Sequence, residues 1–106
     1  MSGRSLLGLL GLAAAAFLAC QIPPPRPHPS LEPMWRDYQK LPLKRALALA
    51  GDPDRAWVAA MAGGAASQQD AIDVALEGCR RKRLDRRLRV PCLVYAVDDE
   101  IVWMQR

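Results

Sequence analysis

The sequence predicts a small α+β domain that begins after an N-terminal leader and a proline-rich segment. Two observations predict this class. Residues 67–83 carry apolar side chains at helical spacing, whereas residues 90–103 alternate β-branched and aromatic residues around an acidic turn. With the segments before them, the expected order is a short helix, a β-hairpin, one long helix and a second β-hairpin. This order suits a small antiparallel or mixed sheet with the helix on one face.

The first expected element is a short helix that ends before Pro42. Its apolar residues recur at spacings of four, three and three, which places them on one helical face: Leu31, Trp35, Tyr38 and Leu41. Aromatic side chains on such a face belong to a hydrophobic core more often than to a ligand site. We therefore expect Trp35 and Tyr38 to be core residues.

Residues 43–62 allow two interpretations. The sequence Asp-Pro-Asp at 52–54 is typical of a helix start, and the alanine-rich stretch after it has high helical propensity. Against this, Leu47 and Leu49 alternate with smaller residues, and residues 57–62 alternate in the same way. The Asp-Pro-Asp sequence would then form the turn between two strands. We favour the β-hairpin.

The long helix is expected to start at Ser67 and to include the basic residues 80–83 in its last part. Ser67 is a suitable N-cap, and acidic residues early in the segment and basic residues late in it match the helix dipole. Gly78 is a weak residue for a helix and suits the close approach of another segment. Four residues form the apolar face: Ile72, Ala75, Leu76 and Cys79.

The second hairpin is expected from Val90 to Trp103, around an acidic turn. Three residues of its first strand should share the face that meets the long helix: Cys92, Val94 and Ala96. The turn contains Asp98, Asp99 and Glu100, and acidic residues in such a position usually form the turn itself.

Residues 1–20 have the layout of a secretory signal peptide. Arg4 precedes an apolar run from Leu6 to Ala19, and small residues crowd the end of that run. The run is shorter and poorer in large apolar residues than a membrane span, which needs roughly 20. We expect the rest of the chain to lie outside the cytoplasm, in a cell envelope.

Phe17-Leu18-Ala19-Cys20 resembles the lipobox of bacterial lipoproteins. Ala19 and Cys20 match that pattern, whereas the family usually has Leu where Phe17 stands and a small residue where Leu18 stands. The resemblance implies that Cys20 is diacylated and becomes the N-terminus, so that the protein is anchored in a bacterial envelope through lipid. Gln21 is not the aspartate of an inner-membrane retention signal, which favours the outer membrane. Plain secretion after Ala15 or Ala16 and an uncleaved anchor remain alternatives.

Residues 21–33 contain six prolines, which favour an extended polyproline II conformation. We interpret this segment as a tether that holds a domain of residues 34–106 away from the bilayer, with a PxxP ligand for a partner domain as the alternative. His28 is the only histidine of the chain, and we assign it no role in a solvated tether.

The chain has three cysteines, an odd number for an oxidising compartment. If Cys20 carries lipid, Cys79 and Cys92 remain as a pair. They form no C-x-x-C motif and no histidine accompanies them, which argues against a redox-active dithiol or a zinc site. We expect a structural disulfide, worth roughly 3 kcal/mol for a loop of about 14 residues.

Residues 42–103 resemble small cell-envelope proteins of proteobacteria, in which a helix cysteine and a following strand cysteine frame a compact domain. Six residues carry the resemblance: Ala75, Leu76, Cys79, Cys92, Tyr95 and Trp103. It implies the fold and the compartment. The biochemical role of that family is unassigned, so the resemblance transfers no functional residue.

Residues 80–89 concentrate positive charge, with seven basic residues and one acidic one: Arg80, Arg81, Lys82, Arg83, Arg86, Arg87 and Arg89 against Asp85. All eleven Asp/Glu and fourteen of the fifteen Lys/Arg follow Cys20, so this part of the chain has a net charge of +3. The run alone has a net charge of +6, which leaves −3 for the other residues after Cys20. Three interpretations remain open. The run is a solvated face with i,i+4 ion pairs, a contact for anionic lipid or acidic envelope polymers, or a nucleic-acid contact.

The sequence does not indicate catalysis. The single histidine lies outside the predicted domain, and no phosphate-binding, dinucleotide-binding or H-E-x-x-H pattern is present. We expect no enzyme, metal or cofactor, but an interaction or structural module of the envelope whose protein partner the sequence does not identify. A basic nucleic-acid-binding protein is the alternative from another class, and the lack of a helix-turn-helix, RRM or zinc pattern weighs against it.

Overall fold

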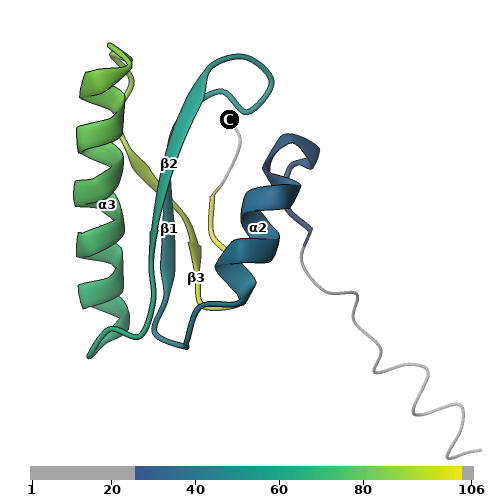
Figure 1. Cartoon of the computed structure of the whole chain (residues 1–106), viewed down its shortest axis with the longest axis vertical. Coiled ribbons are helices and arrows are strands. Elements are labelled where there is room, and N and C mark those ends of the chain that lie inside the picture. Colours follow the sequence, from purple (N-terminus) through teal and green to yellow (C-terminus); the bar gives the residue numbers. More distant parts are fainter. Residues whose placement is uncertain (1–25, 104–106) are drawn as a thin grey trace, which may run out of the picture.

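The computed structural model describes residues 26–103 as a four-stranded antiparallel sheet with a helix on each face (Figure 1). The strands lie in the order β2-β1-β3-β4. The strands and helices are β1 (Ala46–Gly51), β2 (Trp57–Ala62), β3 (Leu93–Val97) and β4 (Glu100–Ile101), with η1 (Pro29–Leu31), α2 (Glu32–Gln39) and α3 (Gln68–Asp85). The predicted α+β class and element order are confirmed. No helix within residues 26–103 has the length and apolar content needed to cross a bilayer.

The first β-hairpin is confirmed and decides between the two interpretations of this segment. β1 pairs with β2 from Ala46 opposite Ala62 to Gly51 opposite Trp57. Gly51 has φ 102°, and a Cβ there would lie 2.2 Å from the carbonyl oxygen of Ala56, so only glycine fits the start of this turn. β1 also pairs with β3 on its other side, so tertiary pairing overrides the local helical propensity.

α3 packs on the sheet face that small side chains line. Ser67 Oγ accepts a hydrogen bond from the Asp70 N–H at 3.0 Å, so the predicted N-cap is confirmed. A Cβ at Gly78 would lie 3.0 Å from the Cβ of Ala60, which explains the glycine as the point of close approach between helix and sheet. The buried cluster on this face contains Ala46, Ala48, Ala50, Val58, Ala60, Ala71, Ala75 and Cys79.

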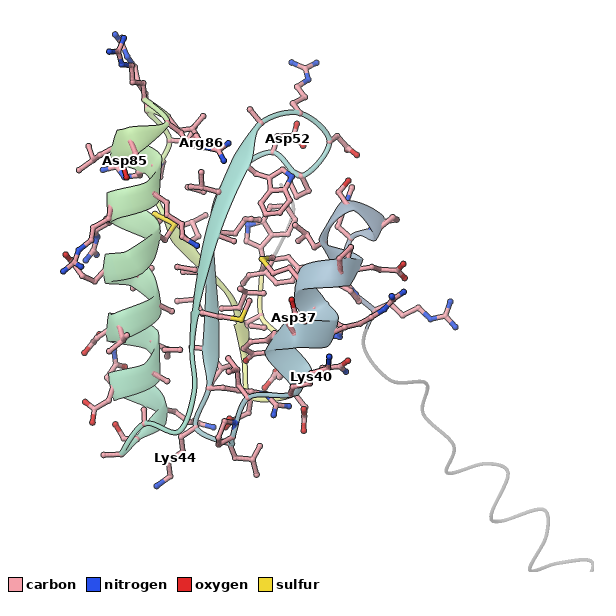
Figure 2. All side chains as sticks on the ribbon, in the orientation of Figure 1. Asp37, Lys40, Lys44, Asp52, Asp85 and Arg86 are labelled. Atoms are coloured by element: carbon pink, nitrogen blue, oxygen red, sulfur yellow. A yellow bond between two sulfur atoms is a disulfide. The ribbon has the colours of Figure 1, made fainter. Side chains whose placement is uncertain are left out.

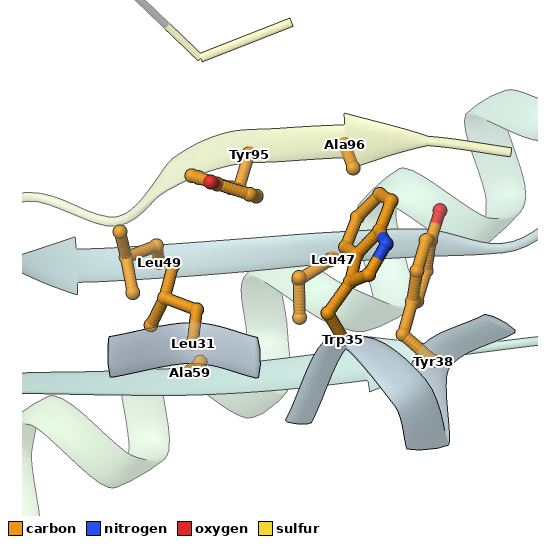
Figure 3. Packing of buried hydrophobic residues seen from close by; sticks show 8 residues of the cluster. All are labelled: Leu31, Trp35, Tyr38, Leu47, Leu49, Ala59, Tyr95 and Ala96. Atoms are coloured by element: carbon orange, nitrogen blue, oxygen red, sulfur yellow. The ribbon is translucent and has the colours of Figure 1, made fainter. Parts of the chain in front are cut away.

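The second face of the sheet is covered by η1 and α2, which the sequence did not place on either face. The cluster between them and the sheet contains Leu31, Trp35, Tyr38, Leu47, Leu49, Ala59, Tyr95 and Ala96 (Figure 3). The ring centroids of Trp35 and Tyr38 are 5.1 Å apart, and Trp35 meets Tyr95 edge to face at 6.5 Å. The prediction that both helix aromatics are core residues is confirmed.

A β-bulge in β3 changes which residues face which helix. Leu47 pairs with Ala96 but Ala48 pairs with Val94, so Tyr95 is the extra residue of β3 at the bulge. Tyr95 and Ala96 therefore both belong to the cluster under α2, whereas Cys92 packs against the cluster under α3. The prediction that Ala96 shares the α3-facing side is wrong, because simple alternation does not hold across a bulge.

The end of the proline-rich segment lies on the domain. The His28 N–H donates to Tyr95 Oη at 3.1 Å, His28 Nε2 lies 2.9 Å from Asp54 Oδ1, and Leu31 is fully buried. Pro29 and Pro33 each occupy the first turn of a helix, where the missing N–H costs no hydrogen bond. Residues 28–33, expected to be part of the tether, thus contact the folded domain, and residues 21–25 lie outside the described range.

Candidate functional site

The disulfide between Cys79 and Cys92 fastens α3 to the segment that enters β3. The two Cα atoms are 6.1 Å apart, within the usual range, and Cys79 is completely buried. This confirms the predicted pairing. Cys20, the predicted lipidation site, lies outside the described residues.

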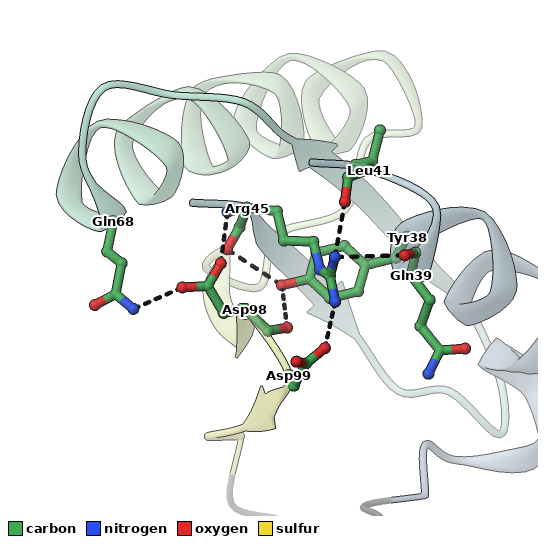
Figure 4. A network of polar contacts seen from close by, with 7 residues as sticks. All are labelled: Tyr38, Gln39, Leu41, Arg45, Gln68, Asp98 and Asp99. Carbon is green, nitrogen blue, oxygen red and sulfur yellow. Dashed lines mark hydrogen bonds and ion pairs between the residues drawn. The ribbon is translucent and has the colours of Figure 1, made fainter. Parts of the chain in front are cut away.

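A polar cluster around Arg45 joins α2, β1 and the β3–β4 turn (Figure 4). Arg45 is buried, and its guanidinium donates to the Leu41 carbonyl at 2.7 Å and forms an ion pair with Asp99. It also lies 5.3 Å from the centre of the Tyr38 ring. The arginine therefore binds the carbonyl of Gln39, the last residue of α2, at 3.4 Å, and that of Leu41 just beyond the helix, which indicates a structural role.

Two groups of this cluster have shifted pKa values. Burial raises the pKa of Tyr38 to about 12, and its hydroxyl lies 2.8 Å from the Asp98 carbonyl. The Arg45 backbone N–H, followed by the Gln68 side chain, holds the pKa of Asp98 below its usual range. Asp98 has φ 48° in the two-residue β3–β4 turn, so its role as a turn former fits the sequence prediction. The cluster fixes chain segments in place, and the Asp99 carboxylate at its rim is exposed to solvent.

The basic run of residues 80–89 is divided among several directions. Arg80 and Arg81 form ion pairs with Glu77 on the exposed side of α3, at 3.9 and 3.3 Å. Arg83 lies near the Val90 carbonyl, at 3.4 Å from Nη1. Arg87 and Arg89 are exposed in the connection after α3, and Arg87 has φ 56°. These five residues therefore do not form one flat basic face.

The two other basic residues of the run, Lys82 and Arg86, line a groove of about 790 Å³. The groove runs along the outer edge of β2, between the C-terminal end of α3 and the Met34 side of α2. Figure 2 shows Arg86 extending from the end of α3 toward β2. The lining residues are Met34, Arg55, Ala56, Trp57, Val58, Ala59, Lys82, Asp85, Arg86 and Leu88.

Lys82 reaches from α3 to the edge strand. Its Nζ donates a hydrogen bond to the Ala59 carbonyl at 2.7 Å, so this carbonyl points away from β1 and into the groove. The groove thus combines backbone groups of an edge strand with three cationic side chains, Arg55, Lys82 and Arg86, and one carboxylate, Asp85. Such a site can bind polar backbone and carboxylate groups.

The sequence did not predict this groove, although two of its lining residues belong to the predicted basic run. Lys82 and Arg86 were candidates for contact with an anionic surface, whereas Arg55 and Trp57 were not singled out as site residues. The only signal for them was their residue type, because arginine and tryptophan are enriched in protein interfaces. Only the strand order shows that β2 is the edge.

Comparison with known proteins finds no match for the chain among protein-family models, curated proteins or solved structures. Within residues 26–103, no group of three or more His, Cys, Asp and Glu side chains is placed to hold a metal ion. The candidate site of the described domain is therefore the groove at the edge of β2.

Proposed function

We propose that this chain is a small extracytoplasmic protein of a bacterial envelope, held at the membrane through lipid on Cys20, whose disulfide-bonded domain acts as an interaction module. The proposal gives the chain no catalytic step. It also places the lipid anchor in the outer membrane and the domain on the side that faces the periplasm.

The Cys79–Cys92 disulfide is the observation that supports this proposal most strongly. Disulfides persist in oxidising compartments and are rare in the cytosol. The domain is also small, a size at which a single hydrophobic core is marginal and covalent cross-links are common. Lipid on Cys20 would account for the third cysteine, so that no free thiol remains.

The order of segments along the chain supports the same proposal. An apolar run with small residues before Cys20 is followed by a proline-rich stretch and then by the folded domain. The hairpin-helix-hairpin order with one helix cysteine and one strand-side cysteine also fits the resemblance to proteobacterial envelope proteins. A module held near a surface needs a binding face, and the groove at β2 provides one.

Cell fractionation tests this proposal. The full chain with a C-terminal epitope tag should be found in the membrane fraction of a bacterial host, and Cys20→Ala should release it. Leu31→Ser is the matched control, because it weakens the domain core but leaves the leader and Cys20 unchanged. Proteinase K should digest the tagged domain once the outer membrane is permeabilised, while a cytoplasmic marker stays intact. A full-length chain in the cytosol would contradict the proposal and favour a nucleic-acid-binding role.

A further inference from the structure

At alternate residues of β2 the backbone groups point to the outer edge of the sheet and bond to no strand of the described domain. The Asp52 N–H donates to the Ala56 carbonyl at 3.0 Å, which fixes which pairs of this antiparallel hairpin exchange hydrogen bonds. By that alternation Val58 and Ala60 bond to β1. The residues whose N–H and carbonyl groups point outward are Trp57, Ala59 and Met61, in agreement with the bond that Lys82 makes to Ala59.

Two walls of different chemistry flank this edge. On the α3 side the groove is lined by the cationic Lys82 and Arg86, the acidic Asp85 and the apolar Leu88, so this wall carries a net positive charge. On the α2 side it is lined by Met34 and Trp57, which are partly buried apolar residues packed against the core. A strand that lies between these walls directs successive side chains alternately toward one and the other.

We propose that this groove binds an extended segment of a partner protein in which acidic side chains alternate with apolar ones, and that the segment adds to β2 as a fifth strand. Its backbone bonds to the outward groups of β2, its carboxylates meet Arg86 and Lys82, and its apolar side chains contact Met34 and Trp57. Arg55, at the hairpin turn, contacts a carboxylate at one end of the segment.

Charge distinguishes such a partner from a second copy of the chain. Pairing two β2 edges would bring the cationic groups of both copies, Arg55, Lys82 and Arg86, into one interface, and like charges oppose association. The opposite sheet edge, β4, spans only Glu100 and Ile101 and is too short to supply a ladder for β2. The acidic partner strand is therefore the occupant that the groove fits.

Lys82 makes the groove selective. In the free domain its Nζ is hydrogen-bonded to the Ala59 carbonyl, which an incoming strand needs as a hydrogen-bond acceptor. A partner carboxylate gives Lys82 a new ion pair and frees this carbonyl, whereas a strand without acidic residues offers no such exchange. A charged side chain over an edge strand is also a common protection against unspecific pairing.

Amide hydrogen exchange measured by NMR on the full chain in non-ionic detergent tests this inference. The probe is a synthetic peptide of about nine residues that alternates Glu and Val, with blocked ends. Its addition should slow the exchange of the Trp57, Ala59 and Met61 amides. The Val58 and Ala60 amides serve as an internal control, because they already bond to β1 and should not change.

Variants then test the side chains. Arg55→Gln with Arg86→Gln should weaken peptide binding about tenfold, the sum expected for two exposed ion pairs, and added salt should weaken binding by the wild type. The matched control is Arg80→Gln with Arg81→Gln, which removes the same charge from the same region but outside the groove, and should change affinity less than about twofold.

Three outcomes would overturn the inference. A peptide of the same composition with all Glu before all Val could bind equally well, the Arg80 and Arg81 control could weaken binding as much as the groove variant, or the edge amides could become protected without peptide as chain concentration rises. The last outcome assigns the edge to a second copy. The inference depends on the proposed interaction role but not on the compartment, so peptide binding and cell fractionation can fail independently.

Discussion

The Nζ of Lys82 lies 2.7 Å from the carbonyl oxygen of Ala59, so a side chain near the end of α3 donates a hydrogen bond to a backbone acceptor on the open edge of β2. Edge strands without such protection pair with other chains. The same bond joins a residue of the basic run to the sheet edge. Lys82 thus connects the charge pattern of the sequence with the topology of the sheet.

Replacing Lys82 with methionine should open the edge of β2. The variant keeps the length of the side chain but cannot donate to the Ala59 carbonyl, so we expect concentration-dependent self-association that the wild type does not show, measured by analytical ultracentrifugation. Lys44→Met is the matched control, because Lys44 Nζ donates at 2.9 Å to the loop carbonyl of Ala66 and not to a strand edge. Equal association of both variants would mean that lost charge, and not the exposed edge, is the cause.

Replacing Arg45 should destabilise the domain strongly. Arg45→Met leaves carbonyl groups at the end of α2 and the Asp99 carboxylate without their donor, so we expect a loss of about 2–4 kcal/mol in the free energy of unfolding, measured with urea. Asp99→Asn should cost less than about 1 kcal/mol, since Asp99 is exposed and water replaces the pair. Similar losses for the two variants would refute the dominant role of the carbonyl contacts.

The sequence predicted most of this fold because its local signals agreed with the tertiary structure. Ser67 caps α3, Gly78 permits the approach to Ala60, and the cysteine count led to the correct pair. The bulge at Tyr95 could not be predicted, because the alternation of residues within β3 does not show how β3 pairs with β1, residue by residue.

The candidate site was less predictable than the fold. The run of residues 80–89 is rich in basic residues throughout, but the helical turn separates Lys82 and Arg86, which face the groove, from Arg80 and Arg81, which face solvent. Arg55 reaches the same groove from a distant hairpin turn, and only the sheet order brings the two segments together. The docking of His28 was also missed, because a proline-rich composition conceals helices that start at Pro29 and Glu32.

Alkaline pH should destabilise the domain through Tyr38. Its pKa is raised to about 12 in the folded chain and is about 10 in the unfolded chain, so the folded state favours the neutral phenol. This contribution is complete below about pH 10 and is lost as the pH rises through about 12, a change on the order of 2–3 kcal/mol. Tyr38→Phe should flatten this part of the pH profile in urea unfolding. Tyr95→Phe keeps the Tyr38 hydroxyl and should retain the slope.

Removing the disulfide should cost the domain about 2–4 kcal/mol. We expect Cys79→Ala with Cys92→Ala to lower the urea midpoint by the corresponding amount, since the bridge restricts the unfolded chain and anchors the entry to β3 on α3. The wild type in reductant should unfold at a similar midpoint. A double variant as stable as the oxidised wild type would show that the apolar core alone holds the domain.

Intact-mass spectrometry of the chain extracted from bacterial membranes, with alkylation before and after reduction, tests the proposed extracytoplasmic location most directly. A mature chain that starts at a diacylated Cys20, takes up no alkylating reagent without reductant and takes up two equivalents after reduction is the result we predict. A chain that retains Met1 and is alkylated at Cys79 and Cys92 without reductant would contradict both the lipid anchor and the location outside the cytoplasm.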